Sequence, residues 1–170
     1  IGANRTKTAP LPNAVGIRVF DGHSNVIWDN FIAGNTGHGV DLQYADYNSV
    51  LGNQIGYDSG QGNGGDGIHV LDSSNNLLGF DLGGNGNTLA ENSGDGIWIG
   101  GASDENRVWG NGIHDNDQDG VTIEYGQRNQ VGGSSTWKRN IINGNGGSGV
   151  HLTTGALGTT VRTNYIGLGL

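Results

Sequence analysis

Short hydrophobic segments recur along this 170-residue chain at nearly regular intervals. The clearest segment is a glycine followed by Ile or Val, a variable residue and a second aliphatic residue, as in Gly16-Ile17-Arg18-Val19. The same pattern starts again at Gly39, Gly67, Gly96, Gly120 and Gly149. The steps between these glycines fall into a shorter and a longer class, and self-similarity at such spacing indicates a repeat protein whose units pack on their own copies.

Two further hydrophobic positions complete each repeat. A second aliphatic residue follows each glycine at a nearly constant distance, at Ile27, Val50, Leu77, Val108, Val131 and Val161. A third lies just after an asparagine, from Asn30 and Ile32 in the first repeat to Asn164 and Ile166 in the last. Three short alternating segments predict three short strands per repeat. Helices are disfavoured, because each glycine inside a helix costs roughly 1 kcal/mol.

Strands that stack on their own copies predict an all-β solenoid. Each coil adds about 4.8 Å, so six coils span roughly 29 Å. The inward aliphatic residues then form continuous stacks. The recurring asparagines suit the corners, where they adopt left-handed conformations and form hydrogen-bonded ladders. A second asparagine column lies at Asn35, Asn92, Asn116 and Asn145. The longer repeats carry insertions, at residues 57–65, 79–86 and 134–139, that we expect to be surface loops.

Several segments resemble a known family of repeats. They include Asn53-Gln54-Ile55-Gly56, Val131-Gly132-Gly133 and Asn164-Tyr165-Ile166-Gly167. The chain resembles the right-handed parallel β-helix proteins of the pectate-lyase-like superfamily, and most closely the Asn/Gly-rich repeats of bacterial secreted or surface proteins. This resemblance implies a right-handed parallel β-helix of about six to seven coils, three short strands per coil, and an extracellular or cell-surface location. It implies no particular activity, because the fold carries lyases, hydrolases, adhesins and inert spacers.

Composition excludes several classes of function. Sixteen acidic and eight basic residues give a formal charge of −8, which argues against nucleic acid or an anionic membrane as a partner. The lack of cysteine excludes disulfides and thiolate metal sites, and no hydrophobic run approaches the ~18 residues needed for membrane insertion. Because methionine is also absent, we interpret residues 1–170 as one β-helix domain that is a processed subunit or a slice of a longer solenoid.

The two ends of the chain stop at the same phase of the repeat, at Ile1-Gly2 and at Ile166-Gly167. Neither end shows a cap, and an uncapped β-helix exposes unpaired backbone and hydrophobic core. We therefore predict that copies stack head to tail, a contact that generates filaments. The residues expected at this interface are Ile1, Gly2, Ile17 and Val19 on one side and Val150, Leu152, Val161 and Ile166 on the other.

Polar and aromatic side chains form an outward row on the glycine-aliphatic strands. The row holds Arg18, Asp41, His69 and Trp98, and continues with Thr122 and His151. Adjacent coils bring such side chains within about 5 Å of one another. A guanidinium, a carboxylate, an imidazole and an indole in a row could bind a cell-surface glycan. The alternative is an ordinary solvated sheet face with favourable ion pairs.

A second column lies immediately before the glycines and contains Asp66, Asp95 and Asp119. Carboxylates about 5 Å apart repel one another unless they are bridged, which suggests calcium; the alternative is that Asp-Gly is favourable turn chemistry. A third outward column, with Trp28, Leu51, Leu78 and Trp109, forms a hydrophobic stripe for a neighbouring solenoid or a loop of the same chain. The five histidines fall in at least three columns, which argues against a histidine metal site.

These observations favour a structural function. We expect an extracellular solenoid module that stacks end to end in a filament, surface layer or stalk, with no catalytic residue and no cofactor other than calcium. One rival is a domain that binds or cleaves polysaccharides through the row Arg18, Asp41, His69 and Trp98. Another is a passive spacer inside a long protein, in which the ends continue covalently.

Overall fold

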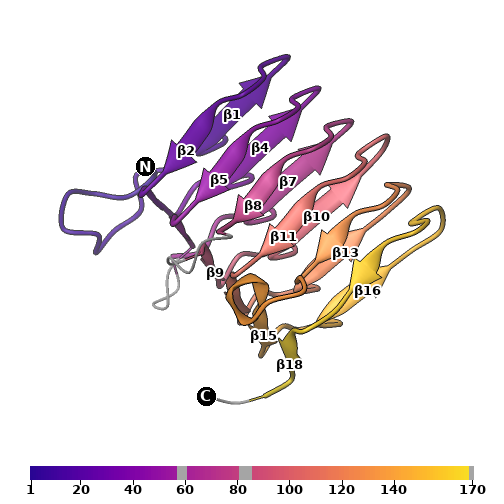
Figure 1. The fold of residues 1–170 in the computed structure, drawn as a ribbon. Coiled ribbons are helices and arrows are strands. Elements are labelled where there is room, and N and C mark those ends of the chain that lie inside the picture. Colours follow the sequence, from indigo (N-terminus) through magenta and orange to yellow (C-terminus); the bar gives the residue numbers. More distant parts are fainter. Residues whose placement is uncertain (57–60, 81–85, 169–170) are drawn as a thin grey trace.

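The computed structural model describes residues 1–56, 61–80 and 86–168, which form a solenoid of parallel strands (Figure 1). The described residues contain three parallel sheets of six strands each. The chain enters the three sheets in turn and returns to the first after every coil, so each strand pairs with its equivalents in the adjacent coils. The predicted parallel β-helix is therefore confirmed, with six coils and three short strands per coil.

Each sheet takes one strand from every coil. The first sheet contains β1 (Ile17–Phe20), β4 (Val40–Gln43), β7 (Ile68–Leu71), β10 (Ile97–Gly100), β13 (Val121–Ile123) and β16 (Val150–Leu152). The second contains β2 (Val26–Trp28), β5 (Ser49–Leu51), β8 (Leu77–Gly79), β11 (Arg107–Trp109), β14 (Gln130–Val131) and β17 (Thr160–Val161). The third contains β3 (Phe31–Ile32), β6 (Gln54–Ile55), β9 (Thr88–Ala90), β12 (Gly112–His114), β15 (Ile141–Asn143) and β18 (Tyr165–Ile166).

Inward aliphatic side chains from the three sheets fill the interior. In the first sheet Val40, Ile68, Ile97 and Val121 lie in register, and all four are fully buried. Each stack is continuous, because the side chain in one coil covers its equivalent in the next. This arrangement lets a chain with only 33% hydrophobic residues enclose a core along its whole length.

The second sheet corrects one sequence prediction. Leu78, not Leu77, is the inward residue of β8, since it pairs with Val50 and Val108 and is fully buried. The next residue, Gly79, pairs with Trp109. Leu78 therefore does not belong to the outward hydrophobic stripe, which a glycine interrupts at this coil.

Part of that stripe is covered by the chain itself. The insertion at residues 134–139 forms a short 3₁₀ helix, η1 (Thr136–Lys138), and the Lys138 ammonium lies 3.5 Å from the Trp109 ring centroid. Trp109 is buried, whereas Trp28, two coils below the glycine, is 69% exposed. The insertions at residues 57–65 and 79–86 lie partly outside the described residues. No helix in the described part of the chain is long and apolar enough to cross a membrane.

Three asparagine ladders run along the corners. Both predicted ladders form, one from Asn30 to Asn164 and one that ends at Asn145. The second also includes Asn13 and Asn63, which were not predicted. A third, which the sequence analysis missed, links Asn25, Asn48, Asn76, Asn106 and Asn129. In each ladder an asparagine oxygen accepts bonds from its neighbour in the preceding coil, so buried amides are satisfied with little help from water.

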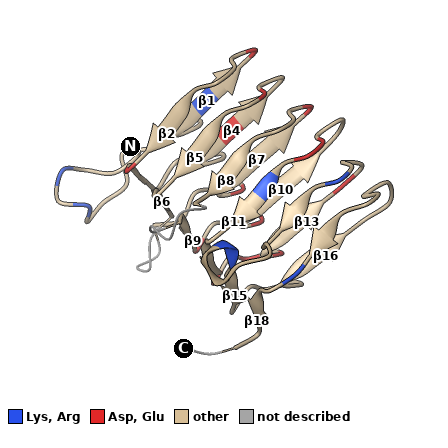
Figure 2. Cartoon of the chain, viewed as in Figure 1, with Lys and Arg blue, Asp and Glu red and all other residues tan. Residues whose placement is uncertain are grey.

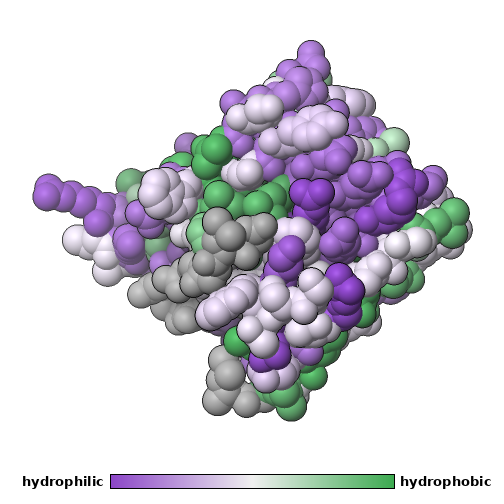
Figure 3. Space-filling model, in the orientation of Figure 1, coloured by the Kyte–Doolittle hydropathy of each residue, from purple (hydrophilic) through white to green (hydrophobic). Residues whose placement is uncertain are grey.

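The last coil exposes hydrophobic side chains that continue the buried stacks. Leu152, Val161 and Ile166 are 43%, 39% and 45% exposed. Figure 3 shows hydrophobic residues at the edge of the molecule where this coil lies. At the other end, Ile17 and Val19 pack against the core and are half-buried, and Gly2 is buried. The end-to-end contacts predicted for these residues stay a prediction.

Candidate functional site

The strand register brings together the outward row. From β1 to β16 the paired positions are Arg18, Asp41, His69, Trp98, Thr122 and His151. At the lower end, Nε of Arg18 lies 2.8 Å from Oδ2 of the fully buried Asp41. Figure 2 shows the basic segment of β1 beside the acidic segment of β4. Gln43 also donates to this oxygen (3.1 Å), so Asp41 is held in place by two donors.

Three aromatic rings stack in the middle of the first sheet. The rings of His38 and His69 have centroids 4.2 Å apart, and those of His69 and Trp98 have centroids 4.5 Å apart with planes inclined by 11°. Gly100 permits this arrangement, since a Cβ at that position would overlap the indole of Trp98. His69 is therefore held between two rings, and the indole lies flat along its own strand.

The aspartate column forms a hydrogen-bond ladder. The amide N–H of Asp95 donates to Oδ1 of Asp66 (2.9 Å), and that of Asp119 donates to Oδ1 of Asp95 (2.8 Å). The amide of Ser148 donates to Oδ1 of Asp119, and Nδ1 of His38 accepts the amide of Asp66 (3.0 Å). Backbone donors thus offset repulsion between the carboxylates. The predicted calcium site at Asp66, Asp95 and Asp119 stays a prediction.

Two of these carboxylates also orient a histidine of the outward row. Nδ1 of His69 lies 2.8 Å from Oδ2 of Asp66, and Nδ1 of His151 lies 2.8 Å from Oδ2 of Asp119. A carboxylate at Nδ1 fixes the ring and leaves Nε2 as the second nitrogen for a ligand or a proton. The site therefore contains two Asp–His dyads on one face of the sheet.

The three aspartates differ in acidity. Burial raises the pKa of Asp95, which is 6% exposed and has no ion-pair partner among the described residues. Burial acts the same way on Asp66, but the neighbouring imidazoles of His38 and His69 and the amide of Asp95 outweigh it and hold the pKa of Asp66 well below its usual value. The pKa of Asp119 is also lowered, by hydrogen bonds from an amide and from His151 that exceed the effect of burial. Neighbouring carboxyls with opposite shifts are suited to acid–base chemistry.

These side chains surround an open groove of about 460 Å³ on the outer face of the first sheet. Its described lining consists of Asp66, His69, Asp95, Trp98, Gln118, Asp119, Thr122, Glu124, His151 and Thr153. Four of these residues are acidic, and none is Lys or Arg. The groove thus combines one flat aromatic ring with many hydrogen-bonding groups and a negative potential.

Comparison with known proteins agrees with this architecture. A family model of the right handed beta helix region matches residues 9–166. The chain belongs to the right-handed β-helix family. No curated protein matches the sequence. Among solved structures, this β-helix is similar to the periplasmic alginate epimerase AlgG, with 19% identity and a TM-score of 0.60.

The match covers 89% of this β-helix but only 39% of the epimerase chain. Two variants of the same enzyme give TM-scores of 0.58 and 0.59 at 18% and 19% identity, again over 89% of this chain. At this identity the likeness establishes the fold alone. The whole epimerase contains much that this β-helix does not match.

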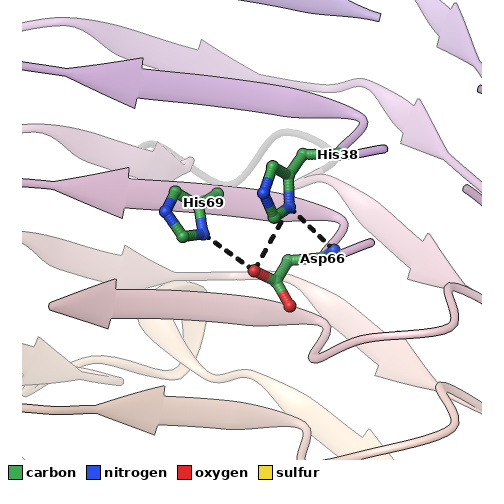
Figure 4. A group of neighbouring side chains, drawn as sticks. All are labelled: His38, Asp66 and His69. Carbon is green, nitrogen blue, oxygen red and sulfur yellow. Dashed lines mark hydrogen bonds and ion pairs between the residues drawn. The ribbon is translucent and has the colours of Figure 1, made fainter. Parts of the chain in front are cut away.

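One cluster in this β-helix was missed by the sequence analysis. His38 precedes β4 in the aspartate column, whereas His69 lies in the outward row of β7, one coil later. Nδ1 of each faces the same carboxylate oxygen, Oδ2 of Asp66, at 3.3 Å and 2.8 Å (Figure 4). Comparing histidines only within one column could not find this group. The available signal was a His-Gly step one coil before Asp66-Gly67-Ile68-His69.

Proposed function

We propose that this β-helix binds a polysaccharide in the groove of the first sheet. The observation that carries the proposal is the indole of Trp98, which lies flat against His69 among four groove carboxylates. Sugar rings pack an apolar face on an aromatic ring, while their hydroxyls hydrogen-bond to surrounding carboxylates. The row of side chains runs parallel to the solenoid axis at steps of about 4.8 Å, so it suits an extended chain of sugars.

The charge of the groove indicates which glycans fit. AlgG is described as an alginate epimerase, and alginate is a polyuronate with a carboxylate on every sugar. In this β-helix the groove carries Asp66, Asp95, Asp119 and Glu124 and no Lys or Arg among its described residues. A polyuronate would meet repulsion along its whole length. We therefore expect neutral polysaccharides to bind and polyuronates to bind weakly.

The proposal is tested by measuring binding to neutral and acidic polysaccharides by calorimetry and affinity electrophoresis. We expect Trp98→Ala to weaken binding about tenfold, which corresponds to loss of one aromatic contact of about 1.4 kcal/mol. Trp28→Ala is the matched control, because Trp28 is an exposed outward tryptophan on the second sheet. Indifference to every glycan, or equal loss in both variants, would refute the proposal. Release of reducing ends in the same mixtures would extend it from binding to cleavage.

We also propose end-to-end association, on the basis of a separate observation. The last coil presents Leu152, Val161 and Ile166 in line with the buried stacks, as a following coil would require. A second copy or a continuation of the same chain could supply that coil. Sedimentation and electron microscopy should show filaments with an axial step of about 29 Å per six-coil copy. A monomer at all concentrations would refute association between copies.

Both proposals agree with an extracellular or cell-surface location. Glycans and surface filaments are met there, and the similar epimerase is described as periplasmic. We propose this location for the β-helix.

A further inference from the structure

Three ligand-type atoms converge at one point beside the groove. Oδ2 of Asp66 lies 3.3 Å from Nδ1 of His38 and 2.8 Å from Nδ1 of His69, and all three atoms lie within 4.8 Å of one another. Figure 4 shows both imidazoles turned toward this single oxygen. The three side chains are partly buried, with 15–29% of each exposed to solvent. An ion could therefore enter from outside without opening the core.

The contacts among His38, Asp66 and His69 go beyond the backbone hydrogen bonds of the aspartate ladder. His23 begins a similar ladder at another corner, where its Nδ1 accepts the amide of Asp46 (3.1 Å). No ion pair joins His23 to the carboxylate of Asp46 in the described structure, whereas His38 faces both the amide and the carboxylate of Asp66. His69 then adds a second imidazole to the same oxygen. Among the histidines that the structure describes, only His38 combines a ladder contact with a second histidine on the same carboxylate.

The donor set and the spacing select a class of ion. Two imidazoles and one carboxylate favour first-row transition metals such as Zn²⁺, whereas Ca²⁺ and Mg²⁺ prefer oxygen ligands. With bonds of about 2.0–2.1 Å, neighbouring ligands of a tetrahedral Zn²⁺ lie about 3.3–3.4 Å apart. The His38–Asp66 separation of 3.3 Å already fits, and the His69–Asp66 pair must open by about half an ångström. The two imidazole ligands lie within 4.8 Å of each other and must come to the same spacing.

We propose that His38, Asp66 and His69 bind a divalent transition-metal ion, with Zn²⁺ as the ion best matched to the three ligands. Because Asp66 and His69 also line the groove, a remaining coordination position is accessible to a ligand in the groove. Binding takes the Nδ1 lone pair of His38 from the Asp66 amide, and it moves the Nδ1 proton of His69 to Nε2, which ends the His69–Asp66 hydrogen bond. That costs two hydrogen bonds of about 1–3 kcal/mol each, which is less than the binding energy of about 10 kcal/mol or more of structural Zn²⁺ sites. This inference does not depend on glycan binding.

The test is calorimetric titration of tag-free protein with Zn²⁺, and with Co²⁺ followed by visible absorption. We expect one ion per chain and a Co²⁺ spectrum typical of tetrahedral nitrogen and oxygen ligands. His38→Gln and His69→Gln should each weaken binding by at least about tenfold. His23→Gln and His151→Gln are the matched controls and should bind as the unmodified protein does, since each removes a ladder or dyad histidine outside the cluster.

Three results would overturn the proposal: no stoichiometric binding of Zn²⁺, equal weakening in the control variants, or displacement of Zn²⁺ by equimolar Ca²⁺. Circular dichroism and thermal unfolding establish that each variant folds. Where a variant does not fold, the Co²⁺ spectrum of the unmodified protein decides, because intense absorption supports the tetrahedral site and the weak absorption of octahedral Co²⁺ overturns it.

Discussion

Asn111 offers the sharpest test of how the solenoid is stabilised. Its Nδ2 donates to the carbonyl of Leu78 (2.9 Å) and to Oδ1 of Asn140 (3.1 Å), and its Oδ1 accepts the amide (3.0 Å) and Nδ2 (3.1 Å) of Asn87. The side chain is 1% exposed, so water does not replace these four bonds. Asn111 also has an ordinary negative φ, and alanine introduces no backbone strain there.

Asn111→Ala should therefore cost about 3–5 kcal/mol of unfolding free energy, from four hydrogen bonds at about 1 kcal/mol each. Asn30→Ala is the control, because Asn30 begins the same ladder, is partly exposed and makes only two side-chain bonds. Its expected cost is about 1–2 kcal/mol. Asn111→Asp keeps the accepting oxygen, but its second oxygen faces the carbonyl of Leu78 and Oδ1 of Asn140. It should therefore lower the unfolding free energy at least as much as alanine does.

The assay is urea unfolding followed by circular dichroism and tryptophan fluorescence. Coincident transitions from the two probes are needed, because repeat proteins can unfold in parts. Equal destabilisation by Asn111→Ala and Asn30→Ala would refute the reasoning, since it would mean that burial does not set the strength of the ladder.

Two further predictions concern the groove. Gly100→Ala should rotate the indole of Trp98 away from His69, because the added Cβ would overlap the ring. We expect a shift in tryptophan fluorescence and severalfold weaker glycan binding, with a change in unfolding free energy of less than about 1.5 kcal/mol. Unchanged fluorescence would contradict the proposed packing. Because folding lowers the pKa of Asp119, its carboxylate contributes stability above the unfolded value near 3.8, and this contribution is lost as pH falls through the folded value. Asp119→Asn should therefore lose less stability than the unmodified protein in urea melts between pH 5 and pH 2; parallel curves would contradict this sign.

Much of the fold follows from strict spacing. The first-sheet register could be predicted because every glycine is followed by an inward aliphatic residue at the next position. Leu77 was misassigned because the distance from the glycine to the second aliphatic residue was allowed to vary slightly, and two adjacent leucines both fit. The inward residue Leu78 lies as far after Gly67 as Val50 lies after Gly39, but Val108 lies one residue further after Gly96. Spacing from the glycine alone therefore could not decide between the two leucines.

The candidate site was only partly predictable for a physical reason. The outward row depends on register alone, so Asp41, His69 and Trp98 could be placed side by side. His38 and His69 come from two different columns, and their side chains meet at Asp66. Comparing residues within a single column does not detect such a contact. The ladder that starts at Asn25 was missed although its members lie two residues before the inward residues of the second sheet, as Asn48 lies before Val50. The Asn-x-aliphatic pattern was compared only for the third strand of each repeat.

The ladders also give the solenoid a defined direction along its axis. Each asparagine donates to an oxygen in the following coil, whereas each aspartate of the groove column accepts an amide from it. The two kinds of ladder therefore run in opposite directions along the same axis. A further coil, from this chain or from another copy, finds matching donors and acceptors only when it enters in the same orientation as the coil before it. Growth of such a structure is vectorial, and face-to-face pairing of two identical ends would not continue the ladders.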